Sequence, residues 1–308
     1  MDFRSVARVD VGGGEMLFLD QPGENSYISH AHSDHLSSKS HRMVIASEPT
    51  ISLSGVKYDG RFVHRNVKLH NAGHMLGATQ VEIVRDGGNF VYTGDFSLED
   101  GFTFKRAEIV EADELLIEAT YGSPHYIFPK KEDIAHALRR EVMSRLTHGN
   151  IIFAVYATGK SQELIKMLNE YCNITPVVSP EVAEVSDIYV RHGQKLSYVS
   201  SASEEAAEMF RGNFVGIIPK SKFRPELRMR LTNHYKKPCY FGSLSGWNIR
   251  FPSDYYDIAL PMSDHADYNG LLEYVEYSGP KKVYVFGAFA QQFSNVLKLR
   301  GYESYALK

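Results

Sequence analysis

Residues 29–36 read Ser-His-Ala-His-Ser-Asp-His-Leu, and this stretch decides how the rest of the chain is interpreted. It places three imidazoles and one carboxylate between His30 and His35. Imidazole nitrogens and carboxylate oxygens are ligands that zinc binds. His30 and His32 are two positions apart, so they point the same way in an extended segment and suit one metal. Asp34 and His35 follow as the chain turns and suit a second metal. The alternative is a solvated polar loop, but ligand types this crowded at metal spacing are rare by accident.

Three more ligand-type residues complete a known pattern. Asp20 closes the apolar run Met16–Leu19, His74 lies in Asn71-Ala72-Gly73-His74, and Asp95 lies in Tyr92-Thr93-Gly94-Asp95-Phe96. Each is weak alone. In this order, around the HxHxDH pattern of residues 30–35, they resemble the metallo-β-lactamase superfamily.

That resemblance implies an α/β fold, the four-layer αβ/βα sandwich of the superfamily, and one or two Zn²⁺ per chain. It implies that His30, His32 and His74 bind one metal, that Asp34 and His35 bind another, and that Asp95 bridges the two. Asp20 would buttress a ligand loop.

Length and composition describe an ordinary core-forming protein. The chain has 308 residues, which suits one large domain or a domain with an insertion. Hydrophobic residues make up 43% and charged residues 23%. The formal net charge is −3, so any nucleic-acid binding must come from a local basic patch.

The sequence predicts a cytoplasmic protein with no membrane partner. Its two cysteines, Cys172 and Cys239, lie far apart and form no disulfide framework, which fits a reducing compartment. The first residues mix acids with arginines, unlike a signal peptide. No apolar run approaches the ~20 residues that a membrane span needs.

Apolar segments in the first part of the chain predict strands that end at the candidate ligands. Residues 43–46 and 66–70 are expected strands, and His74 follows the second. Residues 81–84 and 90–93 around Asp86-Gly87-Gly88 predict a β-hairpin that ends at Asp95. Residues 115–118 predict a further strand that delivers Glu118. Loops at strand ends are where a sheet usually carries its chemistry.

The pattern changes after Glu118. Helices are expected at 131–146 and 160–171, and strands at 149–157, 177–178, 196–199 and 214–218. This alternation indicates a second small α/β domain with a parallel sheet. A helix at 268–277, a strand at 282–286, a helix at 291–300 and a last edge strand follow. The sequence therefore divides into residues 1–122, an insertion at 123–250, and residues 251–308.

Further motifs resemble the β-CASP nucleases, a nucleic-acid-cutting branch of the superfamily. Glu118-Ala119-Thr120-Tyr121-Gly122 resembles their motif A, and Ser263-Asp264-His265-Ala266-Asp267 resembles their motif B. Residues 154–164 resemble the strand-turn-helix of their inserted domain. Motif B and the upstream Gly246-Trp247 are most similar to DNA-ligase-associated exonucleases. The resemblance covers most of the chain and is weakest between about residues 175 and 240.

The sequence departs from that family at motif C. A Val-His-Gly is usual there, but Val285-Phe286-Gly287 stands in its place, and phenylalanine cannot bind a metal. The second metal therefore lacks one histidine. The apolar residue favours DNA as the substrate, whereas Glu118 in place of the Asp of DNA-type members favours RNA. The sequence leaves RNA and single-stranded DNA both open.

Two stretches of the insertion are candidates for nucleic-acid binding. Gly159-Lys160-Ser161 is a near miss for a P-loop, because Ala154 stands where a Walker motif needs glycine. Its glycine-rich turn either offers N–H groups to a phosphate or is only a tight connection. A basic run lies further on, with aromatic residues between its cations, in the domain that would cover the metals. The alternative is a solvated helix face. The candidate residues are Lys160, Ser161, Lys220, Lys222, Arg224, Arg228 and Arg230, with Lys236 and Lys237 ending the run.

Together these features predict a zinc-dependent nuclease, expected to be an exonuclease, that hydrolyses phosphodiester bonds of RNA or single-stranded DNA with a zinc-bound hydroxide. Asp34 and Asp95 would hold the metals and orient the nucleophile. His265, held in one tautomer by Glu118, would serve the leaving oxygen. Two alternatives remain open: a small-molecule metallo-hydrolase of the thioesterase or lactonase type, and a weak nucleic-acid-binding paralogue. The oligomeric state is open too, a homodimer included.

Overall fold

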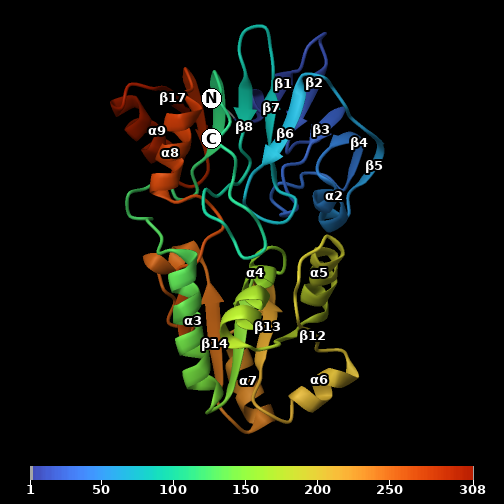
Figure 1. The fold of residues 1–308 in the computed structure, drawn as a ribbon, viewed down its shortest axis with the longest axis vertical. Helices are drawn as coiled ribbons and strands as arrows, with labels where there is room; N and C mark the ends of the chain where they lie inside the picture. The colour runs from blue at the N-terminus through green and yellow to red at the C-terminus, as the bar shows by residue number, and fades with distance from the viewer. Residues whose placement is uncertain (1–2, 308) are drawn as a thin grey trace. The chain divides into compact units, whose positions relative to one another are not determined.

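The computed structural model describes residues 3–307, the side chain of Arg4 excepted (Figure 1). The chain forms two compact units. Unit 1 comprises Met1–Ile127 and Asp264–Lys308, and unit 2 comprises Phe128–Ser263. Both units are α/β, which confirms the predicted fold class.

Unit 1 contains two sheets. The first has the strand order β1-β2-β3-β4-β5, and only β1 and β2 pair antiparallel. The second has the order β17-β16-β9-β8-β7-β6, and its antiparallel strands β6, β7 and β8 include the predicted hairpin. The first-sheet strands are Arg8–Asp10, Met16–Leu19, Asn25–Tyr27, Ser40–Ile45 and Lys57–Arg61. Strands β6 to β9 are Val67–Asn71, Thr79–Ile83, Phe90–Tyr92 and Glu114–Glu118, and β16 and β17 are Lys282–Phe286 and Glu303–Ala306.

The core of unit 1 lies in layers around these sheets. Leu17 and Tyr27 of the first sheet pack with Val81, Tyr92 and Leu116 of the second, so the two sheets bury a common face. The other face of the second sheet packs against α8 (Tyr268–Ser278) and α9 (Ala290–Leu299). Figure 1 shows these two helices together beside β17. Helix α2 (Glu48–Ser54) packs on the outer face of the first sheet, and the short α1 (Phe3–Val6) precedes β1.

Unit 2 is built on a six-stranded sheet in which every pair is parallel, as the alternating pattern predicts. The strand order is β12-β11-β13-β10-β14-β15. In chain order, these strands are β10 (Asn150–Val155), β11 (Val177–Val178), β12 (Val199–Ser200), β13 (Val215–Pro219), β14 (Cys239–Leu244) and β15 (Ile258–Leu260). The connecting helices are α3 (Lys131–Leu146), α4 (Lys160–Met167), α5 (Pro180–Arg191), α6 (Glu204–Met209) and α7 (Glu226–Tyr235). Shorter turns are η1 (Leu168–Cys172), η2 (Lys220–Lys222) and η3 (Gly246–Ile249).

Some elements were predictable to the residue. Helix α3 and strand β16 have the predicted bounds, whereas the helix expected over 160–171 changes to a π-helical turn at Leu168. That turn ends at Asn173, which adopts the left-handed conformation (φ 55°). The sequence did not place α5, α6, α7, β14 or β15.

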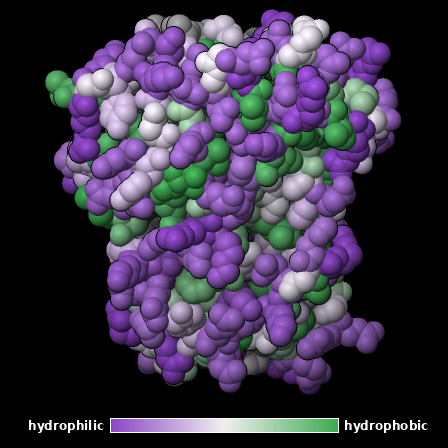
Figure 2. Space-filling view, turned by 45° about the horizontal axis from the view of Figure 1, so that its top comes forward, coloured by the Kyte–Doolittle hydropathy of each residue, from purple (hydrophilic) through white to green (hydrophobic). Residues whose placement is uncertain are grey.

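The surface carries both hydrophilic and apolar side chains. On the face drawn in Figure 2, hydrophilic side chains predominate and apolar residues lie between them in small groups. Cys172 and Cys239 are both buried and unpaired. Within residues 3–307, no helix combines the length and apolar character that crossing a membrane requires.

Candidate metal centre

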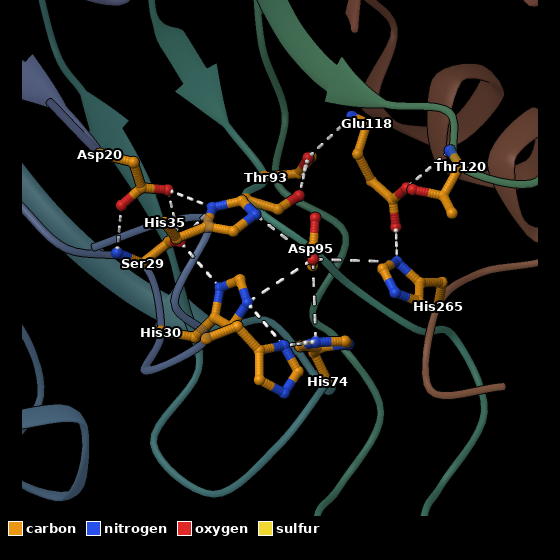
Figure 3. A network of polar contacts seen from close by, with 12 residues as sticks. Asp20, Ser29, His30, His35, His74, Thr93, Asp95, Glu118, Thr120 and His265 are labelled. Carbon is orange, nitrogen blue, oxygen red and sulfur yellow. Dashed lines mark hydrogen bonds and ion pairs between the residues drawn. The ribbon is translucent and has the colours of Figure 1, made fainter. Parts of the chain in front are cut away.

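The candidate ligands of unit 1 come from loops that follow strands. His30, His32 and His35 follow β3, His74 follows β6, and Asp95 follows β8. Glu118 is the last residue of β9, and His265 precedes the N-cap of α8. The ligand loop is tied to both sheets, since Ile28 N donates to Ile45 O and Thr79 N donates to Ser29 O. Residues that are far apart in the sequence therefore meet at one place (Figure 3).

Four of these residues form the first group, His30, His32, His74 and Asp95. His32 Nδ1 lies 3.1 Å from both His30 Nε2 and His74 Nε2. Asp95 Oδ2 lies 3.5 Å from His30 Nε2 and 3.8 Å from His74 Nε2. Zinc bonds of about 2.0–2.2 Å put the corners of a tetrahedron about 3.3–3.6 Å apart. The four donor atoms are therefore spaced to hold one metal ion.

The electrostatics of this group also suit a cation. Burial lowers the pKa of His30 and of His74 well below the usual range, and neighbouring imidazoles lower each further. Burial by itself would raise the pKa of Asp95, but charge on His35 and His265 outweighs it and leaves that pKa well below its usual range. Neutral imidazoles beside an ionised carboxylate are the protonation states that a metal requires. The donor set therefore fits a bound metal.

Asp20 organises the side of the site next to His35. Its backbone is left-handed (φ 48°), which is uncommon for a residue other than glycine. Its carboxylate accepts hydrogen bonds from Ser29 N (2.7 Å), Ser29 Oγ (2.6 Å) and Tyr92 Oη (2.8 Å). It also lies 2.7 Å from His35 Nδ1. The buried carboxylate thus fixes both the loop that carries the ligands and the ring of His35.

His35 and Asp34 are placed differently. His35 Nε2 faces Asp95 Oδ2 at 3.4 Å. Burial would lower the pKa of His35, but the Asp95 and Asp20 carboxylates outweigh burial and raise it well above its usual range. Asp34 is exposed and belongs to neither ligand group found among the described residues. The structure therefore brings His35, but not Asp34, against Asp95.

A second group contains Asp95, Glu118 and His265. His265 Nδ1 lies 2.8 Å from Glu118 Oε1 and 4.0 Å from Asp95 Oδ2. Glu118 is fully buried, and its other oxygen accepts a hydrogen bond of 2.8 Å from Thr120 N. The imidazole of His265 is thus held by a carboxylate that is itself held by the backbone, beside the first group (Figure 3).

Phe286, at the position of the missing histidine, belongs to the core. It ends β16 opposite Glu118, and its ring packs 5.1 Å from Phe3 and 5.8 Å from Tyr92, centroid to centroid. Tyr92 in turn bonds Asp20. Phe286 therefore packs against Tyr92, which bonds the Asp20 carboxylate next to His35. It supplies no donor atom for a metal.

Sequence analysis missed Ser29, Tyr92 and Thr120 as parts of the site. Ser29 bonds Asp20 and lies 3.0 Å from His30 Nδ1, and its only signal was that it directly precedes the histidine pattern. The phenol of Tyr92 and the amide of Thr120 carried no signal, because each acts on a carboxylate from a distant part of the chain.

The arrangement in unit 1 defines an α/β protein with a histidine- and carboxylate-rich metal-binding site. No family model matches the chain. It is 28% identical over 306 residues to a protein of Opitutus terrae named "Probable DNA ligase", a match that covers 93% of this chain and 29% of that one. It is 28% identical over 194 residues to an RNase J-like protein of Methanocaldococcus jannaschii, which covers 61% of this chain and 45% of that one.

A third relative is the endoribonuclease ysh1 of Schizosaccharomyces pombe, 32% identical over 126 residues, covering 40% of this chain and 15% of that one. The chain thus spans less than half the length of each of these relatives. The chain is thus similar, at 28% identity over most of its length, to nucleases of the β-CASP branch of the metallo-β-lactamase superfamily. A solved structure of a protein of unknown function from Enterococcus faecalis V583 shares its fold, with a TM-score of 0.53 and 16% identity over 85% of this chain and 74% of that one.

In unit 2, the glycine-rich turn uses its polar groups internally. Ser161 is fully buried and its hydroxyl donates to Tyr156 O at 2.7 Å. Lys160 is buried as well, and its Nζ lies 3.4 Å from Met262 O. These contacts hold the connection between β10 and α4 together.

The basic run divides into two kinds of residue. Lys222 pairs with Glu181, Lys237 bonds Gly212 O and Asn213, and Arg224 bonds carbonyls of its own loop. Arg228 pairs with Asp257 at 2.7 Å, donates to Tyr255 O and lies over the Phe241 ring. Lys220, Arg230 and Lys236 are exposed. The run therefore contains both structural contacts and exposed cations.

Gly73 is expected to be indispensable for the placement of His74. Its φ is +64°, and an added Cβ would lie 2.3 Å from Ala107 N and 2.7 Å from Ser97 O, both backbone atoms. Gly13 is the matched control, because its φ is +69° but nothing lies within 4 Å. Both Gly→Ala changes should cost about 1–2 kcal/mol for the left-handed backbone. Gly73→Ala should cost about 1–3 kcal/mol more for the clash. Equal losses of unfolding free energy in urea titrations would refute this assignment.

Arg228 and Arg230 should respond differently to neutralisation. Arg228→Gln removes a charge-assisted hydrogen bond at a site that is partly exposed, so we expect a loss of about 1–2 kcal/mol in unfolding free energy. Arg230→Gln should leave stability within about 0.5 kcal/mol, because it is an exposed surface change. Thermal and chemical unfolding of the two variants measure this difference. A destabilised Arg230→Gln beside an unaffected Arg228→Gln would reverse the assignment.

Proposed function

We propose that this chain is a metal-dependent hydrolase that cleaves phosphodiester bonds of RNA or single-stranded DNA. The observation that carries the proposal is the pair formed by the buried Glu118 and the partly exposed His265, beside the four-residue ligand group. Hydrolysis of a small ester needs the metal ligands but gives no reason for this pair. Relatives named RNase J-like protein and endoribonuclease support the same chemistry.

We assign zinc as the metal. His30, His32, His74 and Asp95 would hold the tighter ion, and Asp95 with His35 and Asp34 would hold a looser one once the exposed Asp34 turns inward. Metal ions in such a site supply Lewis acidity toward phosphoryl oxygens and lower the pKa of water. The protein supplies fixed anionic charge at Asp95 and a rigid ligand loop. Asp20, with Ser29 and Tyr92, keeps His35 pointing at Asp95.

His265 is proposed to give a proton to the leaving oxygen or to stabilise its charge. The hydrogen bond to Glu118 holds a proton on Nδ1, so the proton that is exchanged with substrate is the one on Nε2. Thr120 N keeps the Glu118 carboxylate in place from its other oxygen. The pair therefore fixes both the orientation and the tautomer of the catalytic ring.

The finer structural assignments follow the same family. We assign the layers of unit 1 to the four-layer αβ/βα sandwich of metallo-β-lactamases, since two sheets share a buried face and carry helices outside. We assign unit 2 to the β-CASP-like inserted domain, on its parallel sheet. Exonuclease action stays a prediction from the sequence resemblance.

Zinc content should depend on the ligand histidines and not on other histidines. After dialysis, the purified protein should hold more than one zinc per chain but fewer than two, because Phe286 supplies no ligand and Asp34 is exposed. His30→Ala should lose the tighter ion, and His192→Ala, an exposed histidine of unit 2, should keep the wild-type content. Elemental analysis measures all three proteins. Absence of metal in the wild type, with His30→Ala indistinguishable from it, would reject the metal assignment.

His265→Ala should separate catalysis from metal binding. We expect cleavage to fall ~10²–10⁴-fold, the range for a positioned acid or base, while zinc content and unfolding remain as in wild type. Labelled single-stranded RNA and DNA give the rate and a product ladder, which also shows whether single nucleotides leave from one end. His192→Ala serves again as the control. Full activity in His265→Ala would remove this residue from the mechanism.

A zinc-loaded protein that hydrolyses thioesters well and cuts neither nucleic acid would overturn the nuclease proposal itself.

A further inference from the structure

The parallel sheet of unit 2 reverses its direction of winding between β10 and β13. These strands are neighbours, with Val155 opposite Pro219. The connection after β10 runs through α4 to β11 on one side, whereas the connection after β13 runs through α7 to β14 on the other. In open α/β sheets, ligands bind outside the carboxyl ends of the strands at such a switch point. The loops after β10 and β13 therefore bound a candidate binding site within unit 2.

The first residue of each loop carries a side chain suited to a ligand. Tyr156 follows β10 and is 59% exposed, although it directly continues a fully buried strand. Lys220 follows β13, is exposed, and its Nζ lies 5.6 Å from the centroid of the Tyr156 ring. Lys220 makes no ion pair with a carboxylate of the described residues. An aromatic face and an uncompensated cation thus lie side by side.

Buried side chains hold Tyr156 in place. Ser161 donates to Tyr156 O through both its hydroxyl (2.7 Å) and its backbone N–H (3.1 Å). Gln162, fully buried, accepts from Gly159 N at 2.8 Å and donates to Ala157 O at 3.1 Å. The same amide donates to Ser186 Oγ in α5. The loop after β10 is therefore preorganised rather than adaptable, which reduces the ordering cost of binding.

The same bonds rule the turn out as a phosphate cradle. The backbone N–H groups of residues 159–163 all have partners within the turn: Gln162 Oε1 for Gly159, Thr158 O for Lys160, Tyr156 O for Ser161, and Gly159 O for the next two. A P-loop needs such N–H groups free to face phosphate oxygens. What the turn presents outward is the Tyr156 ring.

We propose that Tyr156 and Lys220 form a binding site for an unpaired nucleic-acid strand, in which a base stacks on the Tyr156 ring and the Lys220 ammonium binds the adjacent phosphate. Aromatic platforms beside cations are how proteins bind single strands without reading sequence. The other cations nearby are engaged, Lys222 with Glu181 and Arg224 with its own loop. The inference rests on the proposed nuclease function, since it names how the substrate of that enzyme is held. Base and phosphate are common to RNA and DNA, so either strand can occupy the site.

The test uses the 308-residue chain with His265→Ala added, so that bound strands are not cleaved. Fluorescence anisotropy measures the binding of labelled single-stranded RNA, single-stranded DNA and duplex DNA. Tyr156→Ala should weaken single-strand binding about 5- to 150-fold, the equivalent of one lost stacked base. Tyr156→Phe, which keeps the ring, should bind within about twofold of its parent. Lys220→Gln should reduce the slope of log K against log salt by about 0.7, the value for one phosphate on a single strand.

Two further measurements make the result specific. A strand with abasic sites should bind the parent and Tyr156→Ala equally, because it offers no base to stack. The zinc content and the unfolding free energy of Tyr156→Ala should equal those of Tyr156→Phe, because the Tyr156 side chain is 59% exposed. Equal values show that the fold and the metal centre are intact.

The outcomes separate the two proposals. If the unmodified chain neither binds nor cleaves nucleic acid, the proposed function fails. If it does both, and Tyr156→Ala binds single strands as tightly as Tyr156→Phe, this inference alone is wrong. If Tyr156→Ala loses affinity for single-stranded RNA and DNA to a comparable extent, a shared base-and-phosphate site is supported. An equal loss of affinity for duplex DNA would refute stacking of an unpaired base.

Discussion

The structure of unit 1 depends on one carboxylate oxygen. Asp95 Oδ2 lies within 4.0 Å of nitrogens from His30, His35, His74 and His265. These histidines come from loops of both sheets and from the segment before α8, so this atom is where the separate parts of the unit meet. Because Asp95 is buried, its charge is strongly felt by all four rings. A cation bound there would relieve the crowding of lone pairs that the fold imposes.

Rigidity around this centre comes from buried carboxylates that hold the histidine rings in place. Asp20 collects hydrogen bonds from Ser29 and Tyr92 and fixes His35, while Glu118 is held by Thr120 and fixes His265. Each is a carboxylate that orients an imidazole, which is how outer residues set the tautomer and direction of functional rings. Phe286 extends this support into the apolar core through Tyr92. Position 286, where the sequence resemblance led us to expect a histidine ligand, is thus part of the packing around Tyr92.

In unit 2 as well, polar side chains make contacts that stabilise the fold. Ser161, which a P-loop motif would offer to phosphate, and Gln162 hold the turn after β10 together. Arg228 joins α7 to the segment before β15. What remains exposed at the switch point is an aromatic ring and a cation. Several side chains that local composition marks as binding candidates thus make structural contacts, because a charged or hydroxyl side chain serves structure as readily as recognition.

The sequence by itself determined the donor types and the regular elements. The histidine pattern could be found because its ligand spacing is local, and His74 and Asp95 because they follow it in the order of a known family pattern. Helix α3 and strand β16 could be found because each is an uninterrupted segment without glycine or proline. The contact between Glu118 and His265 was expected from the family resemblance. Only the tertiary structure decided that His35 faces Asp95 while Asp34 stays exposed, and that Lys220 lies beside Tyr156. These relations join residues that are distant in the chain or differ only in the direction of a side chain. No local pattern encodes them, because packing of the sheets and the turns between them sets both the distance and the direction.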